Sequence, residues 1–213
     1  MKKIAIYGFG GFGREVACMI NAINEESPKW DLIGYFDDGQ EKGAANKYGK
    51  VLGGLNELNA WNEELNVVFS IASAPVLKKL AGKIVNENVV FPNLWAPNVL
   101  FLDKETVKMG KGNLFFFGTR ISCDVTLGDF NLLNSHASLG HDAVLGDYNV
   151  LGPMVRVSGN TRVGDCNFFG VQAIALQGLK IGNNTKIGAN SVVMRNTKDD
   201  TLYMGNPAKK VAL

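Results

Sequence analysis

The chain has 213 residues, of which 46% are apolar and 20% charged, and its formal net charge is +2. This length suits one large domain or two small ones, and it can bury a core without disulfides or metal. The small charge, without a basic block, excludes nucleic acid and anionic membrane surfaces as partners. No uninterrupted apolar run reaches 18 residues, which excludes a membrane-spanning helix.

The three cysteines are odd in number and far apart, so they predict neither a disulfide framework nor a zinc knuckle. The N-terminal apolar stretch is short and is interrupted by Arg14 and Glu15, which argues against a signal peptide. We therefore expect a cytoplasmic protein.

The first 92 residues predict a small α/β unit. Residues 3–7 predict a buried strand and residues 14–24 the helix behind it. The turn between them fits G-x-G-x-x-G, through Gly8, Gly10, Gly11 and Gly13. In this pattern the glycines allow a tight turn and close approach of the backbone to phosphate, and the helix N-terminus supplies partial positive charge. The alternative is a tight strand-to-helix turn that binds nothing.

A second strand is predicted over residues 31–36, and it ends at Asp37 and Asp38, where an acidic side chain commonly accepts ligand hydroxyls. A further strand (residues 67–72), a helix (75–86) and a last short strand (89–91) complete the unit. Only half of a dinucleotide-binding fold fits into this length, so a ligand of mononucleotide size is expected rather than NAD.

The second half of the chain repeats every six residues. Each sixth residue from Met109 to Val193 is apolar without exception. In nine cases the next residue is glycine: Gly110, Gly128, Gly140, Gly146, Gly152, Gly164, Gly170, Gly182 and Gly188.

Such a repeat predicts a solenoid over residues 109–196. One short strand per repeat points one apolar side chain inward, and a tight turn follows, at which glycine or asparagine tolerates a positive φ. Three strands close one triangular coil, and each coil is buried only against its neighbours, so fifteen repeats predict five coils. Periodicity leaves the hand of the coil open, although the usual crossover rule favours a right-handed one.

The [Leu/Ile/Val]-Gly-x-x-[small]-x hexapeptide resembles that of the hexapeptide-repeat acyltransferases, as does the tail through Gly205-Asn206-Pro207-Ala208-Lys209. This resemblance implies a left-handed parallel β-helix over residues 93–213 after a Rossmann-like half unit over residues 1–92. With the glycine-rich start and the Asp-Asp pair, the whole chain resembles the sialic-acid O-acetyltransferase type. That group includes enzymes that acetylate nucleotide-linked 4-amino-4,6-dideoxy sugars.

The resemblance implies that the front unit binds the nucleotide part of the sugar substrate near Gly8, Gly10, Gly11, Gly13, Asp37 and Asp38. Relatives often have histidine where this chain has Phe12. Gly140-His141-Asp142 resembles the catalytic histidine of the family with its acidic neighbour, which implies that His141 is the general base and Asp142 its orienting partner. Asn134 matches a frequent family position and is expected to face the sugar. His136 lies outside the motif, and we expect it at a coil edge.

The resemblance also implies a homotrimer that binds acetyl-CoA along the outside of the β-helix, between protomers, with no metal. The expected contacts are Gly159, Gly170, Gly188, Ala189 and Lys209, with Lys210 as a second phosphate-binding candidate. Many relatives have a second histidine at the position of Val150. The predicted reaction is direct acetyl transfer to a sugar amine or hydroxyl for surface glycan synthesis, without a covalent enzyme intermediate.

Four alternatives stay open. The first is a non-catalytic trimer that binds a nucleotide sugar. The second is a β-helical zinc enzyme that uses His136 and His141 as ligands, although the third protein ligand that a catalytic zinc needs is missing. The glycine-rich turn also permits an NAD-dependent oxidoreductase, against which the short front unit argues. The last is an acetyltransferase of free amino acids such as serine, whose front domain is helical.

Overall fold

The computed structural model describes residues 1–211 and divides into two compact units, one of residues Met1–Pro97 and one that begins at Asn98. No helix among the described residues is long and apolar enough to cross a membrane.

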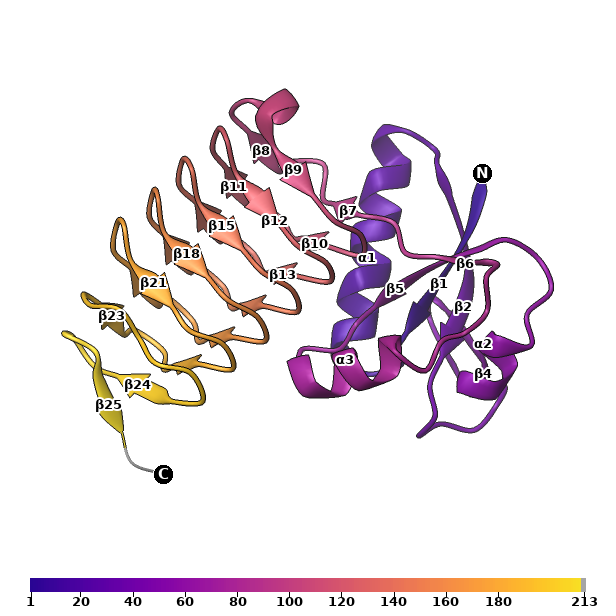
Figure 1. Cartoon of the computed structure of the whole chain (residues 1–213). Helices are drawn as coiled ribbons and strands as arrows, with labels where there is room; N and C mark the ends of the chain where they lie inside the picture. The colour runs from indigo at the N-terminus through magenta and orange to yellow at the C-terminus, as the bar shows by residue number, and fades with distance from the viewer. Residues whose placement is uncertain (212–213) are drawn as a thin grey trace. The chain divides into compact units, whose positions relative to one another are not determined.

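The first unit is an α/β fold (Figure 1). Its elements follow one another in the order β1 (Lys2–Tyr7), α1 (Gly11–Glu26), β2 (Trp30–Phe36), β3 (Ala45–Asn46), β4 (Gly49–Gly53), α2 (Leu55–Asn59), β5 (Leu65–Phe69), α3 (Ala74–Ala81) and β6 (Val89–Val90). The sheet has the strand order β3-β4-β2-β1-β5-β6, and β1 pairs in parallel with both β2 and β5. The chain thus leaves β1 toward one side of the sheet and later returns to the other. Ligands of open α/β sheets bind at the carboxyl ends of the strands at such a reversal.

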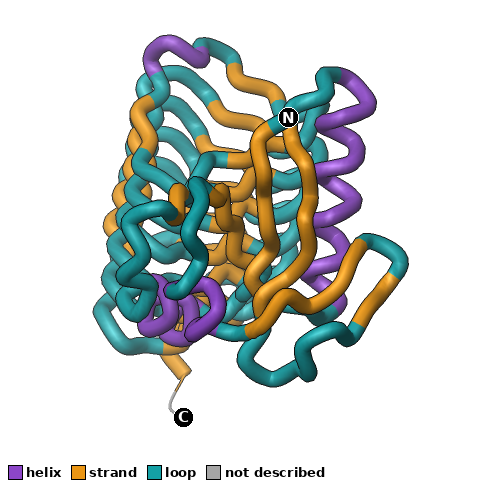
Figure 2. Tube along the Cα trace, turned by 90° about the vertical axis from the view of Figure 1, so that its right-hand side faces the viewer, coloured by secondary structure: helices purple, strands orange, loops and turns teal. Residues whose placement is uncertain are grey.

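Apolar side chains of β1 and of one face of α1 form the core of this unit, and α1 packs against β1 and β2 (Figure 2). The helix begins at Gly11, three residues earlier than predicted, because Gly10 is its N-cap. β5 starts at Leu65, before the apolar run that predicted it. Asn66 is buried inside this strand, and its amide donates to the carbonyl of Lys3 at 3.0 Å.

The residues from Leu94 to Val211 form the predicted parallel β-helix. Its strands have two or three residues each and form three sheets, in the orders β25-β24-β22-β19-β16-β13-β10-β7, β23-β20-β17-β14-β11-β8 and β21-β18-β15-β12-β9. Their bounds are β7 (Leu94–Trp95), β8 (Leu100–Phe101), β9 (Lys108–Met109), β10 (Leu114–Phe115), β11 (Arg120–Ile121), β12 (Thr126–Leu127), β13 (Leu132–Leu133), β14 (Ser138–Leu139), β15 (Val144–Leu145), β16 (Val150–Leu151), β17 (Arg156–Val157), β18 (Arg162–Val163), β19 (Phe168–Phe169), β20 (Ile174–Ala175), β21 (Lys180–Ile181), β22 (Lys186–Ile187), β23 (Val192–Val193), β24 (Leu202–Met204) and β25 (Lys209–Val211).

The strand stack begins before the predicted start at Met109. β7 and β8 precede it, but Phe101 and Met109 are eight residues apart because a 3₁₀ turn, η1 (Lys104–Thr106), lies between them. This insertion breaks the six-residue period and hides the first two strands from the pattern.

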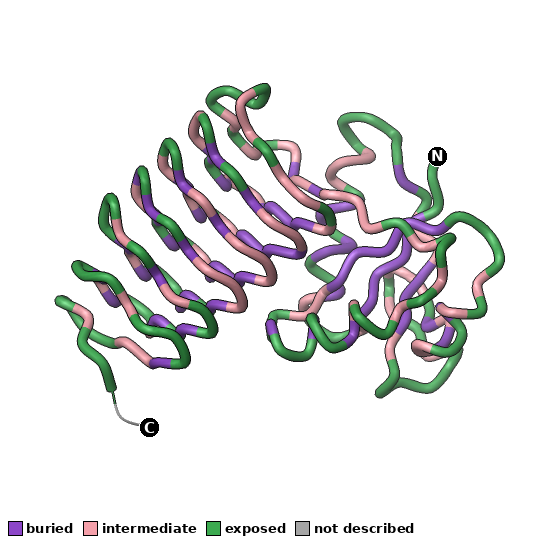
Figure 3. The backbone as a smooth tube through the Cα atoms, viewed as in Figure 1, coloured by how far each residue is buried: buried purple, intermediate pink, exposed green. Residues whose placement is uncertain are grey.

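The second residue of each strand from β10 to β23 is buried, and the buried stretches recur along the coils in Figure 3. An asparagine ladder lies in the interior at one corner, formed by Asn113, Asn131, Asn149 and Asn167. The Oδ1 atoms of Asn113, Asn131 and Asn149 each accept from the backbone N–H and the side-chain amide of the asparagine one coil later, at 2.9 to 3.1 Å. The Oδ1 of Asn167 accepts from the backbone N–H of Thr185 at 2.7 Å. The ladder therefore satisfies buried amides that would otherwise be unpaired.

The expected role of the repeat glycines is wrong in one respect. None of the nine glycines after an inward apolar residue has a positive φ. Every sixth residue from Gly112 to Asn190 has one instead, and most of these are not glycine. At the repeat glycines the neighbouring coil leaves no room for a side chain. A Cβ on Gly128 or Gly146 would collide with an aspartate carboxylate of the next coil.

Candidate functional site

The carboxyl ends of the strands in the α/β unit surround a cavity of about 280 Å³. This is close to the smallest volume usual for small-molecule sites. Its walls come from the ends of β1 and β2, the start of α2, and α3 with the residues around it. The lining residues are Tyr7, Gly8, Asp37, Asp38, Gly39, Leu55, Ile71, Val76, Lys79, Leu80 and Lys83.

Protein donors hold both predicted carboxylates in place. Asp37 accepts from the backbone N–H of Phe9 at 2.8 Å through one oxygen and from that of Gly39 at 2.8 Å through the other. Asp38 accepts from the N–H of Leu55 at 2.8 Å and from the hydroxyl of Tyr7 at 2.6 Å. The two side chains therefore shape the cavity as well as lining it.

Tyr7 is a site residue that the sequence analysis missed. Burial raises the pKa of its phenol well above the usual range, and the hydrogen bond to Asp38 raises this pKa further. The phenol therefore stays neutral and donates to the carboxylate. The sequence does place Tyr7 at the end of the first predicted strand, and this position could have identified it, because ligands bind at the carboxyl ends of parallel strands in such sheets.

The glycines of the G-x-G-x-x-G turn differ in their roles. Gly8 has a φ of +117°, and a Cβ there would collide with Ser70. A Cβ on Gly13 would collide with the carbonyl of Gly8, so this glycine lets α1 close against the turn. Gly10 has nothing within 4 Å of the Cβ position, so its backbone is open to a ligand.

His141 and Asp142 lie at a corner of the β-helix, in the turn between β14 and β15. The Nδ1 atom of His141 is 2.7 Å from a carboxylate oxygen of Asp142, and both side chains are about half exposed, at 53% and 59%. Asp142 has a φ of +58°, in the left-handed region, while its N–H donates to the carbonyl of Cys123. The carboxylate at Nδ1 favours a proton on that nitrogen, which leaves Nε2 free to accept one.

Equivalent positions of neighbouring coils are eighteen residues apart, which places Cys123, His141 and Gly159 in register along this corner. The imidazole of His141 lies over Gly159, because a Cβ there would be 2.6 Å from Nε2. Within the described residues the N–H of Gly159 donates no hydrogen bond. One corner of a single chain thus places a basic nitrogen over the buried backbone of Gly159.

The remaining predicted contacts lie elsewhere on the β-helix. Asn134 and His136 belong to the preceding corner of the same coil, between β13 and β14, so the structure does not bring Asn134 to His141 within one chain. Gly170, Gly188 and Ala189 lie on this second corner, in later coils. Beside them is a groove of about 320 Å³ lined by Met154, Arg156, Gln172, Ile174, Asn190 and Val192, which the sequence analysis missed.

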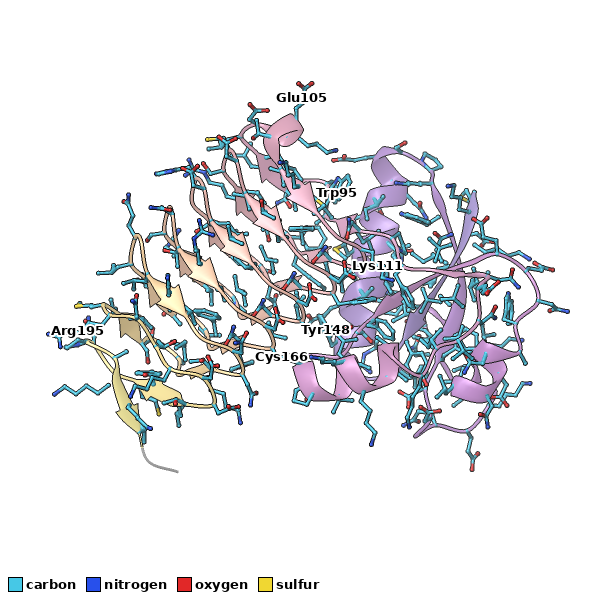
Figure 4. The ribbon with its side chains drawn as sticks, viewed as in Figure 1. Trp95, Glu105, Lys111, Tyr148, Cys166 and Arg195 are labelled. Atoms are coloured by element: carbon cyan, nitrogen blue, oxygen red, sulfur yellow. The ribbon has the colours of Figure 1, made fainter. Side chains whose placement is uncertain are left out.

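Lys209 is exposed on β25, which pairs antiparallel with β24. Val150 lies on β16, away from the corner of His141, and is buried. The third corner carries side chains such as Lys111, Tyr148 and Cys166, which Figure 4 labels. The part of the chain that the structure covers has no group of three or more histidine, cysteine, aspartate or glutamate side chains placed to hold a metal ion.

Comparisons with known proteins agree with this two-part construction. Residues 3–84 match the family model of the PglD N-terminal domain. The acetyltransferase domain of PglB from Neisseria gonorrhoeae, solved with acetyl coenzyme A, has a TM-score of 0.88 at 23% identity, and the match covers 99% of each chain. WeeI from Acinetobacter baumannii also has a TM-score of 0.88, at 26% identity over 99% of this chain and 100% of that one.

A mutant of GDP-perosamine N-acetyltransferase from Caulobacter crescentus, in complex with CoA and GDP-perosamine, likewise has a TM-score of 0.88. Its identity is 26%, over 100% of this chain and 98% of that one. A search of curated protein sequences finds no match.

These findings confirm the fold class predicted from the sequence, an α/β half unit followed by a left-handed parallel β-helix. They also confirm the resemblance to hexapeptide-repeat acetyltransferases of nucleotide-linked amino sugars.

Proposed function

We propose that the protein transfers the acetyl group of acetyl-CoA to an amine or hydroxyl of a nucleotide-linked sugar. The observation that carries the proposal is the half-exposed His141–Asp142 pair at a corner of the β-helix. It stands in a fold shared over nearly the whole chain with an acetyltransferase domain solved with acetyl coenzyme A and with a GDP-perosamine N-acetyltransferase solved with CoA and GDP-perosamine.

In the proposed reaction, Nε2 of His141 takes the proton of the sugar nucleophile as that atom attacks the thioester carbonyl carbon. The carbon–sulfur bond then breaks, and the imidazolium returns the proton to the CoA thiolate. Asp142 stabilises the positive charge on the ring. Backbone N–H groups of the coils near His141 would donate to the oxyanion, a contact that strengthens as charge develops.

The groove on the second corner suits the pantetheine arm of CoA. Met154, Ile174 and Val192 supply apolar surface, Gln172 and Asn190 supply amides, and Arg156 supplies a positive charge. Gly170, Gly188 and Ala189 lie beside it, and the exposed Lys209 and Lys210 are candidates for the phosphates.

Within one chain this groove and His141 lie at different corners, with a strand of the β-helix between them. We therefore propose a homotrimer in which the histidine corner of one protomer faces the groove of its neighbour. The α/β cavity then binds the nucleotide of the sugar substrate. A cytoplasmic location fits these substrates.

The test is acetyl transfer from acetyl-CoA to nucleotide-linked amino sugars, followed through release of free CoA thiol. Replacing His141 with alanine is expected to lower turnover by about 10² or more, since general base catalysis typically contributes that much. Acetyl-CoA binding should remain near the wild-type level. A variant with unchanged turnover would show that His141 is not the base.

The non-catalytic alternative makes a different prediction. A nucleotide-sugar-binding trimer would be stabilised against heat by a nucleotide sugar but not by acetyl-CoA, whereas the acetyltransferase is stabilised by both.

A further inference from the structure

We propose that Lys79 and Lys83 bind the diphosphate of the nucleotide-linked substrate, so that the α/β cavity holds its ligand with the phosphates toward α3. This inference rests on the proposed function and adds to it two residues and an orientation.

Asp37 and Asp38 form an acidic wall of the cavity. Each of the four carboxylate oxygens of Asp37 and Asp38 already accepts a hydrogen bond, from Phe9, Gly39, Leu55 or Tyr7. Fixed in this way, the two carboxylates have no need of a lysine to compensate them. Each oxygen retains a second acceptor position, so this wall still suits hydroxyl or N–H donors of a ligand.

Lys79 and Lys83 form a basic wall of the same cavity. Lys79 lies in the last turn of α3, and Lys83 follows one turn later, where its N–H donates to the carbonyl of Leu80. Both side chains are exposed and line the cavity together with Val76 and Leu80. Neither ammonium forms an ion pair with an acidic residue of residues 1–211. Two cations four residues apart thus face the same cavity with their donors free.

A cavity with acceptors on one wall and cations on the other matches a ligand with donors at one end and negative charge at the other. A nucleoside diphosphate has this polarity, because its hydroxyl groups donate and its phosphates are anionic. Lysine binds phosphate as a point charge, so two lysines on one face can each meet one phosphate group.

A structural role for the lysines has to be separated from this one. Lys78 and Lys79 both lie in the last turn of α3, where a positive charge stabilises the negative end of the helix dipole. Lys78 does not line the cavity, so it is the matched control for any effect on the helix.

The experiment measures binding of UDP, GDP, dTDP and CDP, and of the corresponding nucleosides, by titration calorimetry. The proteins are the wild type, Lys79→Gln/Lys83→Gln and Lys78→Gln. For the diphosphate that the wild type binds best, we expect the double variant to lose about tenfold or more in affinity, while K78Q loses little. Nucleoside affinity and acetyl-CoA affinity should be the same in all three, and added salt should weaken diphosphate binding less in the double variant.

The unfavourable outcomes are distinct from one another. Equal diphosphate affinity in the wild type and the double variant, or an equal loss in K78Q, overturns the lysine assignment and leaves the proposed function standing. A wild-type protein that binds acetyl-CoA but none of the diphosphates overturns both the lysine assignment and the nucleotide-linked acceptor.

Discussion

The imidazole of His141 depends on two neighbours that hold it from different sides. A carboxylate oxygen of Asp142 lies 2.7 Å from Nδ1 of the ring. Gly159, on the next coil, has no side chain and so leaves room for the ring above it. The φ of Gly159 is not in the left-handed region, so alanine suits its backbone, and only the space above it requires glycine. The residue at this position therefore controls where the base points.

We expect Gly159→Ala to lower kcat/KM by about tenfold or more while changing the melting temperature little. The added methyl group would lie 2.6 Å from Nε2, and the ring would have to turn away and weaken its contact with Asp142. Gly82→Ala is the control, because nothing lies closer than 3.5 Å to a Cβ there. Wild-type activity in G159A would show that the ring position is not limiting.

The place of Asp37 and Asp38 after the second predicted strand selected them as candidates, whereas His141 and Asp142 were selected through the resemblance to the acyltransferase family. Tyr7 and the lysines of the cavity were missed, because no motif marks them. These residues line the same cavity as the aspartates only because β1 pairs with both β2 and β5, which brings segments far apart in the sequence to the carboxyl ends of the strands.

At the scale of the element, the six-residue period predicted the β-helix because one inward side chain per strand is a strict packing requirement. The pattern failed where this requirement is interrupted. The turn η1 adds two residues between Phe101 and Met109. In the α/β unit, the buried polar Asn66 similarly concealed the start of β5 from the apolar run that predicted this strand. The role of the repeat glycines was also predicted wrongly, because glycine is favoured both where a Cβ has no room and where φ is positive, and the sequence does not distinguish these two reasons.

The asparagine ladder leads to a prediction about stability. Asn149 receives bonds from Asn167 and donates to Asn131, so Asn149→Ala removes one rung from the middle and leaves the N–H of Asn167 buried and unpaired. We expect the free energy of unfolding to fall by about 2–4 kcal/mol, as measured by urea denaturation. Thr126→Ala, at an exposed position of β12, is the control and should change it by less than about 0.5 kcal/mol. Similar losses in the two variants would mean that the ladder adds no stability of its own.

At the scale of the whole molecule, each chain carries the histidine corner and the groove at different corners of the β-helix. If both parts of a site came from one chain, acetyl-CoA would have to reach around the solenoid. If they come from two chains, three sites form in a closed trimer and each protomer contributes to two of them. The two arrangements can be told apart by mixing two inactive variants, because activity returns in mixed trimers only if each site is built from two chains.

We expect His141→Ala and Ile174→Trp, which fills the groove, to be inactive alone and to recover activity when they are unfolded and refolded together. In an equal mixture about one site in four combines an intact histidine corner with an intact groove from the neighbouring chain, so about a quarter of wild-type activity should return. Light scattering establishes that the refolded mixture is trimeric. The matched control combines His141→Ala with Gly159→Ala, because both changes affect the same corner and no mixed site has that corner intact. Absence of recovery in the first mixture, despite trimer formation, would show that each site belongs to a single chain.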